Sequence, residues 1–588
     1  MSLNIKPLIN NELWLVIVVF FAYAVGTLTL QHYLPSQVDF IPNIMVVGLL
    51  CVGMTALLTR ISIKTVGLDS IFWLLLFLLV LVQPFFLSYD YLDNLIFPLA
   101  TLLACFILSV IMNNVIDKRR ILQYSAYGLI LVGAINALLQ LFQYLNVPSV
   151  SSLVMPVQAS DIRFYGNVAQ PNQLAFIYAL AIVACHFMYQ QSELKLRTLT
   201  VLLLFVFTAG IALSSSRGGL ILALASLLFY IISYKSLISF IKNLVPTALT
   251  MLSGYLFGLY LLDIYTLPTA ANAVSRMTEG SLHLRVELIQ QAWVQFQHHP
   301  TIGVGLGNLL ADSIHHVDEL EWFVFSIHSH NLVTQVAAEL GIIGLMLLLL
   351  PVYIIVKGYW QSRIIEMSFV LVCLLIIGLY SFSEYPLWFT RFLILAVFFL
   401  SIINTKKVVV NIKTNFLFGL LCMLLATGSG YCYYQYQSYS RANSFLINYD
   451  YTNLENMSAE EKQEFADIQV QMVTDLAPIF GFSDYKELYI YYLLPEDNDQ
   501  LPDRIALGNR VLTKFLTQTV LLKQALYLGL DNQQSESLQL FKSACVLNHN
   551  EKCDEVTKYL SDLADEYENF DNINRSYNIW KLKNESKP

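Results

Sequence analysis

The residues best suited to acid–base chemistry stand where an apolar segment begins, near residue 330. His330 directly precedes Asn331. Asn331, Gln335 and Glu339 follow one another at steps of four residues, which places them on one face of a helix. Polar residues inside such segments mark functional sites by default, and a neutral imidazole accepts a proton near pH 7. His330 is therefore predicted to be a general base, whereas a packing network between helices explains Gln335 equally well.

Two arginines have surroundings that favour anion binding. Arg217 lies in a turn of hydroxyl and glycine residues, 214–219, where freed backbone N–H groups add to an anion site. Arg285 flanks an amphipathic helix, which is predicted to lie at the membrane surface. The apolar residues of that helix are spaced by 4, 3, 4 and 3: Leu282, Val286, Ile289, Trp293 and Phe296. Because the guanidinium fork binds phosphate in bidentate fashion, both arginines are predicted to bind phosphate.

Polar turns elsewhere supply candidates for substrate binding. They are the amides Gln170, Asn172 and Gln173, the cation Arg163, and the neighbours Glu384 and Tyr385. The three amides surround Pro171, a residue typical of a helix start. They are predicted to bind sugar hydroxyls or phosphate oxygens, and helix capping is the competing interpretation.

The patterns of several other chemistries are missing from the sequence. It contains no Cys or His cluster with zinc spacing, no P-loop and no paired Asp-x-Asp of metal-dependent sugar-nucleotide transferases. The Pro and Gly-rich turn from His299 to Gly307 follows a helix rather than a strand, which excludes a dinucleotide loop. We therefore expect neither a metal nor a cofactor.

Apolar segments dominate the first 435 residues. Of the 588 residues, 56% are hydrophobic and 13% are charged, well below the level of about a quarter charged that is usual in soluble domains. This predicts an all-α polytopic membrane protein with about 13 transmembrane helices. The apolar runs centre on residues 13–31, 40–59, 69–87, 95–113, 123–144, 173–190, 198–215, 218–234, 244–263, 331–356, 364–382, 387–404 and 415–435.

Basic residues set the expected orientation, because cytoplasmic loops carry an excess of Lys and Arg. With the N-terminus inside, 15 of the 20 basic residues before residue 436 fall in the cytoplasm. The five outside are all arginines: Arg163, Arg217, Arg276, Arg285 and Arg391. The use of Arg alone on one face favours phosphate binding there, although Arg276 and Arg391 fit anchors of helix ends equally well.

The composition predicts a transmembrane catalytic domain, residues 1–435, and a polar domain, residues 436–588. Two long outside loops, about 146–172 and 263–330, are expected to be functional. The tail has 24 acidic and 14 basic residues and so holds most of the net charge of −8, which argues against nucleic acid as a partner. It is predicted to be helical, as tetratricopeptide-like repeats or a generic bundle, with helices at 457–476, 503–529, 534–546 and 552–568.

An odd number of spans would put the tail in the periplasm of a bacterial inner membrane. Cys545 and Cys553 are the two cysteines of the tail, and an oxidising compartment could pair them as a disulfide. The other six fall in or beside apolar segments, where they behave as small apolar residues.

Taken in order, these motifs resemble the O-antigen ligase and polymerase superfamily. His330-Asn331 followed by the Gly-Ile-Ile-Gly at 341–344 is similar to its signature. The turn at Arg217 and the segment from Arg285 to Gly307 resemble its two pyrophosphate-binding arginine motifs. The segments 170–175 and 384–387, with the acidic tail, resemble more specifically the PglL-type bacterial O-oligosaccharyltransferases.

The resemblance implies a GT-C-like helical bundle with a lipid-linked donor. A glycan would pass, with inversion and without metal, from undecaprenyl pyrophosphate to Ser or Thr hydroxyls of periplasmic or pilin proteins. Arg217 and Arg285 would bind the pyrophosphate and His330 would activate the hydroxyl. The donor would be positioned by Gln170, Asn172 and Tyr385, whereas Arg163 and Arg276 match no motif securely.

Other functions stay open. An O-antigen ligase would use the lipid A core as acceptor, and a polymerase would join repeat units. Both share the donor chemistry, but the large tail favours a protein acceptor, which benefits from a docking surface. A glycolipid flippase or exporter would need ion-coupling residues through the membrane depth. Here the charged residues cluster at one face, with Glu339 as the main exception.

We expect residues after Tyr436 to lie in the periplasm. An alkaline phosphatase fused to the C-terminus should be active, because 15 of the 20 basic residues lie on the opposite face. The same reporter fused after Lys235, in a predicted cytoplasmic loop, should be inactive. If only a cytoplasmic reporter works at the C-terminus, the outer-face assignment of the five arginines fails.

Overall fold

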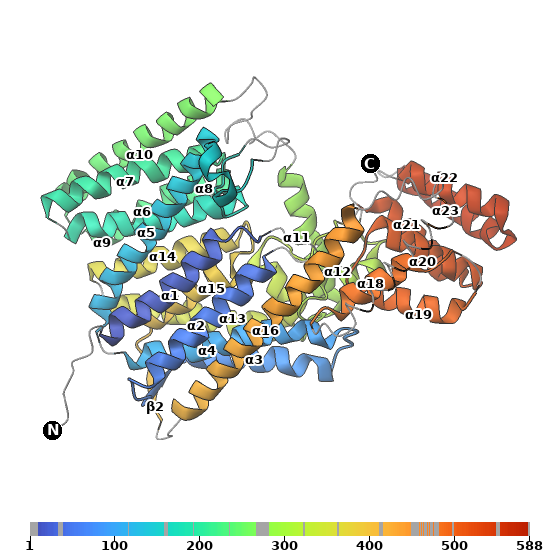
Figure 1. The fold of residues 1–588 in the computed structure, drawn as a ribbon, viewed down its shortest axis with the longest axis horizontal. Coiled ribbons are helices and arrows are strands. Elements are labelled where there is room, and N and C mark those ends of the chain that lie inside the picture. Colours follow the sequence, from blue (N-terminus) through green and yellow to red (C-terminus); the bar gives the residue numbers. More distant parts are fainter. Residues whose placement is uncertain are drawn as a thin grey trace. The chain divides into compact units, whose positions relative to one another are not determined.

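The computed structural model is almost entirely helical (Figure 1). It describes residues 10–32, 39–115, 117–157, 163–191, 193–234, 236–265, 281–320, 324–361, 364–410, 415–448, 481–496, 499–547 and 553–585, with isolated residues between 458 and 474. Within these residues the only strands are β1 (Thr65–Gly67) and β2 (Lys407–Val409), which pair in antiparallel fashion.

Ten helical segments in the described part of the chain are long and apolar enough to cross a membrane. They contain α1 (Asn11–Leu28), α2 (Phe40–Leu58), α3 (Leu68–Val82) with η1 (Gln83–Phe85), η2 (Leu92–Leu95) with α4 (Ile96–Asn114), α5 (Lys118–Leu145), α6 (Pro171–Gln191), α7 (Leu194–Leu213), α10 (Leu237–Tyr265), α13 (Leu332–Gln361) and the first part of α16 (Asn415–Asn448). Shorter apolar helices are α8 (Arg217–Ser226) with α9 (Leu228–Ser233), α14 (Ile365–Ser381) and α15 (Thr390–Ile403). The predicted all-α polytopic membrane fold is confirmed, and every one of the predicted apolar runs is helical.

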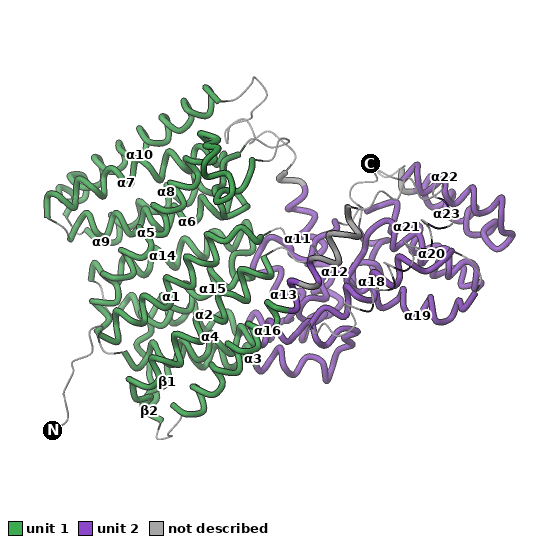
Figure 2. Tube along the Cα trace, in the orientation of Figure 1, with its two compact units in different colours: residues 1–77, 100–279, 347–434 green, residues 78–99, 280–346, 435–588 purple. Residues whose placement is uncertain are grey.

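The helices form two compact units, which Figure 2 colours separately. Unit 1 comprises residues 1–77, 100–279 and 347–434. Unit 2 comprises residues 78–99, 280–346 and 435–588, so it combines the acidic tail with residues of the second long loop. The unit boundaries fall inside α3, α4, α13 and α16.

In unit 1 the central element is α6, which packs against α5, α7, α8 and α14. Every residue from Gln173 to Met188 is buried. Next to it, α10 packs closely on α7, because Gly254 and Gly258 lie four residues apart on one face. A Cβ on either glycine would come within 2.4 Å of a carbonyl oxygen of α7. Small residues at this spacing are the usual means of close helix contact in membranes.

In unit 2 the tail forms a run of helices in which each packs against the next. They are α18 (Ser483–Leu493), α19 (Leu501–Leu512), α20 (Gln518–Leu530), α21 (Gln534–Val546), α22 (Cys553–Glu566) and α23 (Asp571–Glu585), with η8 (Glu568–Phe570) before the last. Their core also includes Val294, Leu310 and Ile314 from the second long loop. That shared core explains why loop and tail belong to one unit.

The predicted helix 503–529 is wrong as a single helix. The chain breaks it into α19 and α20, because Thr517 caps α20 by accepting a hydrogen bond from Val520 N at 3.4 Å. The sequence pattern also missed α18 and α23, and most of the predicted helix 457–476 lies outside the described residues. Cys545 and Cys553 form a disulfide between α21 and the start of α22.

Within unit 2, residues 78–99 attach to the tail through η2. The carboxylate of Asp93 accepts hydrogen bonds from Gly481 N and Ser483 N, both at 3.1 Å, and from Ser483 Oγ at 2.5 Å. It therefore caps the start of α18 from a distant part of the chain. Asn94 adds a hydrogen bond to Asp484 at 2.9 Å, and Tyr91 donates to a carboxylate further along α18.

We expect Asp93→Ala to loosen the start of α18 by about 1–3 kcal/mol, because two backbone donors lose their acceptor. Hydrogen exchange of full-length protein should show faster exchange in α18 peptides than in α20 peptides. Asp90→Ala, at an exposed neighbouring aspartate, is the matched control and should leave α18 unchanged. Equal protection in both variants would show that Asp93 does not hold this helix.

Candidate functional site

The side chain of Asn172 connects three segments of unit 1. It lies in the first turn of α6, directly after Pro171. Its Oδ1 accepts hydrogen bonds from Arg163 Nη2 at 3.2 Å and from Ser216 Oγ at 2.7 Å. Its Nδ2 donates to Glu384 Oε1 at 3.0 Å. The structure thus brings Arg163, Asn172 and Glu384, three of the predicted binding residues, into one network.

This network joins a cation to a carboxylate through a neutral amide. Arg163 is anchored a second time, because its Nε donates to Ser214 O at 2.9 Å. Glu384 is only 7% exposed, so its charge depends on donors such as the Asn172 amide. An amide can accept from two donors and donate to a carboxylate at the same time, which an aspartate at this position could not do.

The turn between α14 and α15 carries both Glu384 and Tyr385. Tyr385 is partly exposed, and its ring lies 5.4 Å from the ring of Phe389 in a tilted arrangement. It directly precedes η6 (Pro386–Trp388). The structure therefore places a partly exposed tyrosine directly after Glu384 in the chain, in the same turn.

Arg217 is the first residue of α8. Ser216 caps this helix, accepting a hydrogen bond from Gly219 N at 3.0 Å. Gly219 allows α8 to approach α6, since a Cβ there would lie 2.3 Å from that of Ala175. No described atom comes within 4 Å of the Cβ position of Gly218, so there is open space beside the first turn. A helix N-terminus with an arginine in its first turn is suited to binding an anion.

Gln170 and Gln173 have tasks inside the fold. Gln170 Oε1 accepts a hydrogen bond from Gln173 N at 2.7 Å, which is the capping interpretation. Gln173, 5% exposed, accepts a hydrogen bond from the fully buried Arg391.

Arg391 also donates to Asp39 at 2.9 Å, and His32 donates to the same carboxylate. Burial opposes ionisation of Asp39, but the charge of Arg391 and the hydrogen bond from His32 outweigh it and hold its pKa at about 2.

In unit 2 the Pro and Gly-rich turn docks on a break in α13. Gly341 has φ 63° and ψ −159°, a combination of backbone angles that lies outside the helical region and that glycine adopts readily. On either side of it the turn bonds to the helix backbone: Val304 N to Ala338 O and Ile342 N to Pro300 O, both at 2.8 Å. A Cβ on Gly341 would lie 2.4 Å from the backbone of the turn. A glycine is therefore required at the break.

The carboxylate of Glu339 belongs to this same turn. Its Oε1 accepts from Gly307 N at 2.9 Å, and its carbonyl oxygen accepts from Gln83 Nε2 at 2.8 Å. Gln335 makes local contacts too, because its Oε1 accepts from Ser329 N at 2.6 Å. The packing interpretation thus applies to Gln335, and Glu339 is engaged with a backbone turn rather than with a chain of proton carriers.

His330 lies immediately before α13 in a left-handed conformation, with φ 54°. Asn331 caps the helix, accepting from Val333 N at 3.0 Å and Thr334 N at 3.2 Å. A left-handed backbone is uncommon outside glycine and is found at functional positions. Burial, and then the charge of His330, lower the pKa of His328 to about 3. His328 is thus a weak base, and His330 remains the candidate.

The helix α11 (Ser281–His298) turns its predicted apolar face outward. Val286 and Trp293 are 54% and 48% exposed, whereas Ala292 on the other side is fully buried. An exposed apolar face is what a helix at a membrane surface needs. Arg285 is partly exposed beside it. Arg276 lies outside the described residues.

Two family profiles match the chain. Residues 200–349 match that of the O-antigen ligases. Residues 368–555 match that of the C-terminal region of virulence factor membrane-bound polymerases. Over residues 200–349 the chain is therefore similar to the O-antigen ligases.

Two similar proteins of Acinetobacter baylyi (strain ATCC 33305 / BD413 / ADP1) carry names that describe an activity. The ComP-specific O-oligosaccharyltransferase is 23% identical over 396 residues, which cover 63% of this chain and 69% of the relative. The general O-oligosaccharyltransferase is 24% identical over 316 residues, 49% of this chain and 52% of the relative. Both names describe glycosyltransferases, the class of enzyme that the sequence predicts for this chain.

The region that matches the O-antigen ligases, residues 200–349, contains three of the predicted site residues. They are Arg217 in unit 1, and Arg285 and His330 in unit 2. Asn172 precedes that region and Glu384 falls in the second matched region. Asp39 and His32 were missed by sequence reasoning; their only signal is that they flank the loop before a predicted span.

We expect Asn172→Asp to reduce transfer by about 5–150-fold, the equivalent of 1–3 kcal/mol for a buried group left unpaired. The aspartate has no donor for Glu384 and adds a second negative charge. The double variant Asn172→Asp/Glu384→Gln restores a donor–acceptor pair and should recover part of the loss. Transfer and thermal unfolding of wild type, both single variants and the double variant give the coupling. A double variant as impaired as the sum of the singles would contradict this link.

Proposed function

We propose that this protein is a protein O-oligosaccharyltransferase of the O-antigen ligase family. It transfers a preassembled glycan from undecaprenyl pyrophosphate to Ser or Thr hydroxyls of periplasmic or pilin proteins. The observation that carries the proposal is Arg217 in the open first turn of α8, where Gly218 leaves room for an anion. The names of the two Acinetobacter relatives support the same reaction class.

The donor needs charge neutralisation. When the bond between the anomeric carbon and the diphosphate oxygen breaks, the electron pair stays on the pyrophosphate. Arg217 and Arg285 neutralise this charge, each through a bidentate fork. The helix dipole of α8 adds to Arg217. Tyr385 and the Arg163–Asn172–Glu384 network position the donor, and Gln170 and Gln173 act indirectly by holding the start of α6.

The acceptor needs a base. The hydroxyl oxygen of Ser or Thr attacks the anomeric carbon from the face opposite the diphosphate, which inverts the configuration. His330 takes the hydroxyl proton as the new bond forms. Its position before the capped helix α13, with a fixed left-handed backbone, supports this role. No step of this mechanism calls for a metal ion.

The proposed compartment follows from the donor. Sugar nucleotides are not supplied on the periplasmic side of the bacterial inner membrane. An activated glycan reaches that side on a polyprenyl carrier. The chain is a multi-pass membrane protein, and the distribution of its basic residues supports an outer position for the arginines. Residues 436–588 then lie in the periplasm, where they can bind a folded acceptor.

The second candidate is an O-antigen ligase, which the profile match over residues 200–349 supports. It would use the same donor and the lipid A core as acceptor. Deleting the gene separates the two functions. Loss of glycan mass from periplasmic proteins with normal lipopolysaccharide banding supports the oligosaccharyltransferase, and the opposite pattern supports the ligase. The flippase alternative is weaker, because Glu339 is engaged with the turn at Gly307.

We expect His330→Ala to lower single-turnover transfer by about 10²–10⁴-fold with nearly normal donor binding, since the base acts only as the hydroxyl loses its proton. Arg217→Ala and Arg285→Ala should weaken donor binding as well, because the diphosphate is charged before and during transfer. Arg217→Lys and Arg285→Lys should recover only part of the donor binding, because a point charge does not reproduce the bidentate fork.

The assay uses purified enzyme and a polyprenyl-pyrophosphate glycan. Arg197→Ala, at an exposed arginine on the predicted cytoplasmic face, is the matched control and should behave as wild type. Normal transfer by His330→Ala would exclude His330 as the base. Normal donor binding by both Arg→Ala variants would place the diphosphate elsewhere, with Arg163 and Arg276 next in line.

A further inference from the structure

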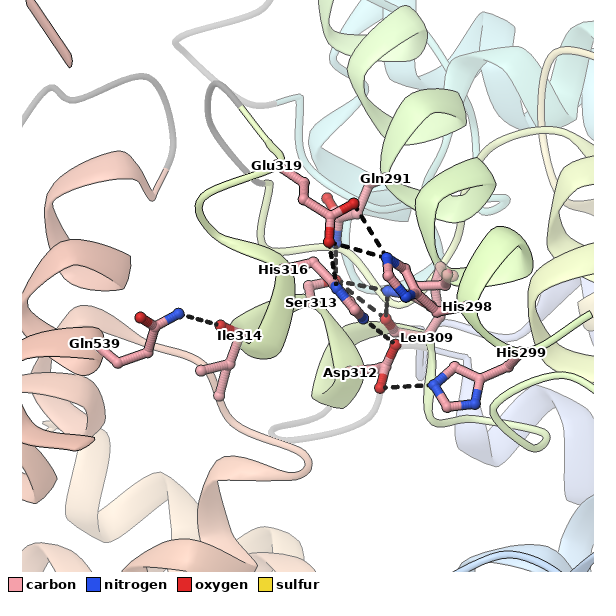
Figure 3. Close-up of polar contacts among 11 residues, drawn as sticks. Gln291, His298, His299, Leu309, Asp312, Ser313, Ile314, His316, Glu319 and Gln539 are labelled. Carbon is pink, nitrogen blue, oxygen red and sulfur yellow. Dashed lines mark hydrogen bonds and ion pairs between the residues drawn. The ribbon is translucent and has the colours of Figure 1, made fainter. Parts of the chain in front are cut away.

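Four of the ten histidines of the chain lie within a short segment of the second long loop, at 298, 299, 315 and 316. The segment runs from the end of α11 through α12 (Leu309–Ser313) to η5 (Ile314–His316), all within unit 2. Figure 3 shows that the side chains of His298, His299 and His316 turn toward the carboxylates of Asp312 and Glu319. The proposed transfer mechanism uses none of these five residues.

The inner part of the cluster is His299, Asp312 and His316. His299 Nε2 lies 3.3 Å from Asp312 Oδ1, and His316 Nε2 lies 3.2 Å from Asp312 Oδ2. Ligand atoms of the three residues all lie within 4.8 Å of one another. Zinc binds histidine nitrogen and carboxylate oxygen at about 2.0–2.2 Å in tetrahedral geometry, which separates neighbouring ligand atoms by about 3.3–3.5 Å. The two nitrogen–oxygen separations at Asp312, 3.3 Å from His299 and 3.2 Å from His316, are close to that edge length.

Two observations distinguish this group from an ordinary hydrogen-bonded cluster. Asp312 Oδ2 is buried and has no hydrogen-bond partner among the described residues, although it is near His316 Nε2. On the other side of the ring, His316 Nδ1 donates to Glu319 Oε1 at 3.1 Å. When the ring is neutral, donation from Nδ1 leaves the lone pair of Nε2 facing the lone pairs of Asp312 Oδ2. A cation between them removes the repulsion.

We propose that His299, Asp312 and His316 bind a zinc ion, with water in the fourth position. Glu319 then plays the part that a carboxylate has behind a metal-bound histidine, since it holds the His316 ring and fixes its tautomer. His298 supports the same carboxylate through Nε2 at 2.9 Å, and its ring stacks on that of His316 at 4.0 Å.

The ion would fasten two parts of unit 2 to each other. His299 begins the turn that docks on the break in α13, and its carbonyl oxygen accepts from Gly303 N at 3.1 Å. Asp312 and His316 belong to the α12–η5 segment, which also contacts α21 through Gln539 and Ile314 (Figure 3). The site is therefore structural: it holds the end of the helix that carries Arg285 and takes no part in the transfer step.

The test is metal binding by full-length enzyme purified in detergent with a tag that lacks histidine. After chelator treatment and dialysis, Zn²⁺ is titrated and its stoichiometry measured by mass spectrometry. Co²⁺ serves as a spectroscopic probe for tetrahedral nitrogen and oxygen ligands. We expect one ion per chain and a higher thermal unfolding midpoint for the zinc-loaded protein than for the stripped protein.

The variants rank the ligands. Asp312→Asn and His316→Ala should weaken Zn²⁺ binding by more than about 100-fold, and Glu319→Gln by about 10–100-fold, the usual effect of a supporting residue. His315→Ala, at the exposed neighbouring histidine, is the matched control and should bind as wild type. Asp312→Asn keeps the shape of the side chain, so its unfolding midpoint without metal should match that of the stripped wild type.

Three outcomes would overturn the proposal. Wild type binds no Zn²⁺ and gives no tetrahedral Co²⁺ spectrum; or Asp312→Asn binds as well as wild type; or His315→Ala loses as much affinity as His316→Ala. If His298→Ala and Glu319→Gln abolish binding while Asp312→Asn does not, the ion lies between His298, His316 and Glu319, and the assigned ligand set is wrong.

Discussion

Polar groups buried away from water must find partners inside the protein, and in a membrane protein this requirement shapes every irregular segment. In unit 1 a single amide, Asn172, accepts from Arg163 and donates to Glu384, so that one neutral side chain contacts both a cation and a carboxylate. In unit 2 the break at Gly341 leaves backbone groups of α13 unpaired, and the glycine turn supplies their partners. These motifs thus have a physical origin before any substrate is considered.

The sequence predicted helices at the apolar runs because an apolar run of this length has few alternatives to a helix in lipid. Ten helical segments of the described residues are long and apolar enough to cross a membrane, so the count of about 13 spans stays a prediction. The sequence predicted helix boundaries less well where a single residue decides them. The helix α19 ends at Leu512 and Thr517 caps the start of α20, which apolar spacing across 503–529 cannot show. Residues 218–234 likewise form two helices, α8 and α9, rather than one. The amphipathic pattern of α11 was read correctly, yet only the structure shows that its apolar side faces outward.

The site was predictable as motifs but not as contacts. Arg217 and His330 could be chosen from local residue types alone. The bond between Asn172 and Glu384 joins residues 212 positions apart, and no local pattern encodes it. The same holds for Arg391, whose partners Asp39 and Gln173 come from two other segments. With both partners and complete burial, Arg391 fits the structural role that the sequence left open, rather than a role in binding donor.

The histidine cluster shows why ligand spacing in a sequence is an incomplete guide to metal sites. Asp312 and His316 lie four residues apart, a local spacing that zinc sites use, whereas His299 comes from the end of α11. Folding of the loop, not local spacing, brings this third residue to the other two. A structural ion there is compatible with a transfer step that uses arginines and a histidine alone. The ion would fix the position of α11, and therefore of Arg285. A requirement for metal in folding is thus distinct from a requirement for metal in catalysis.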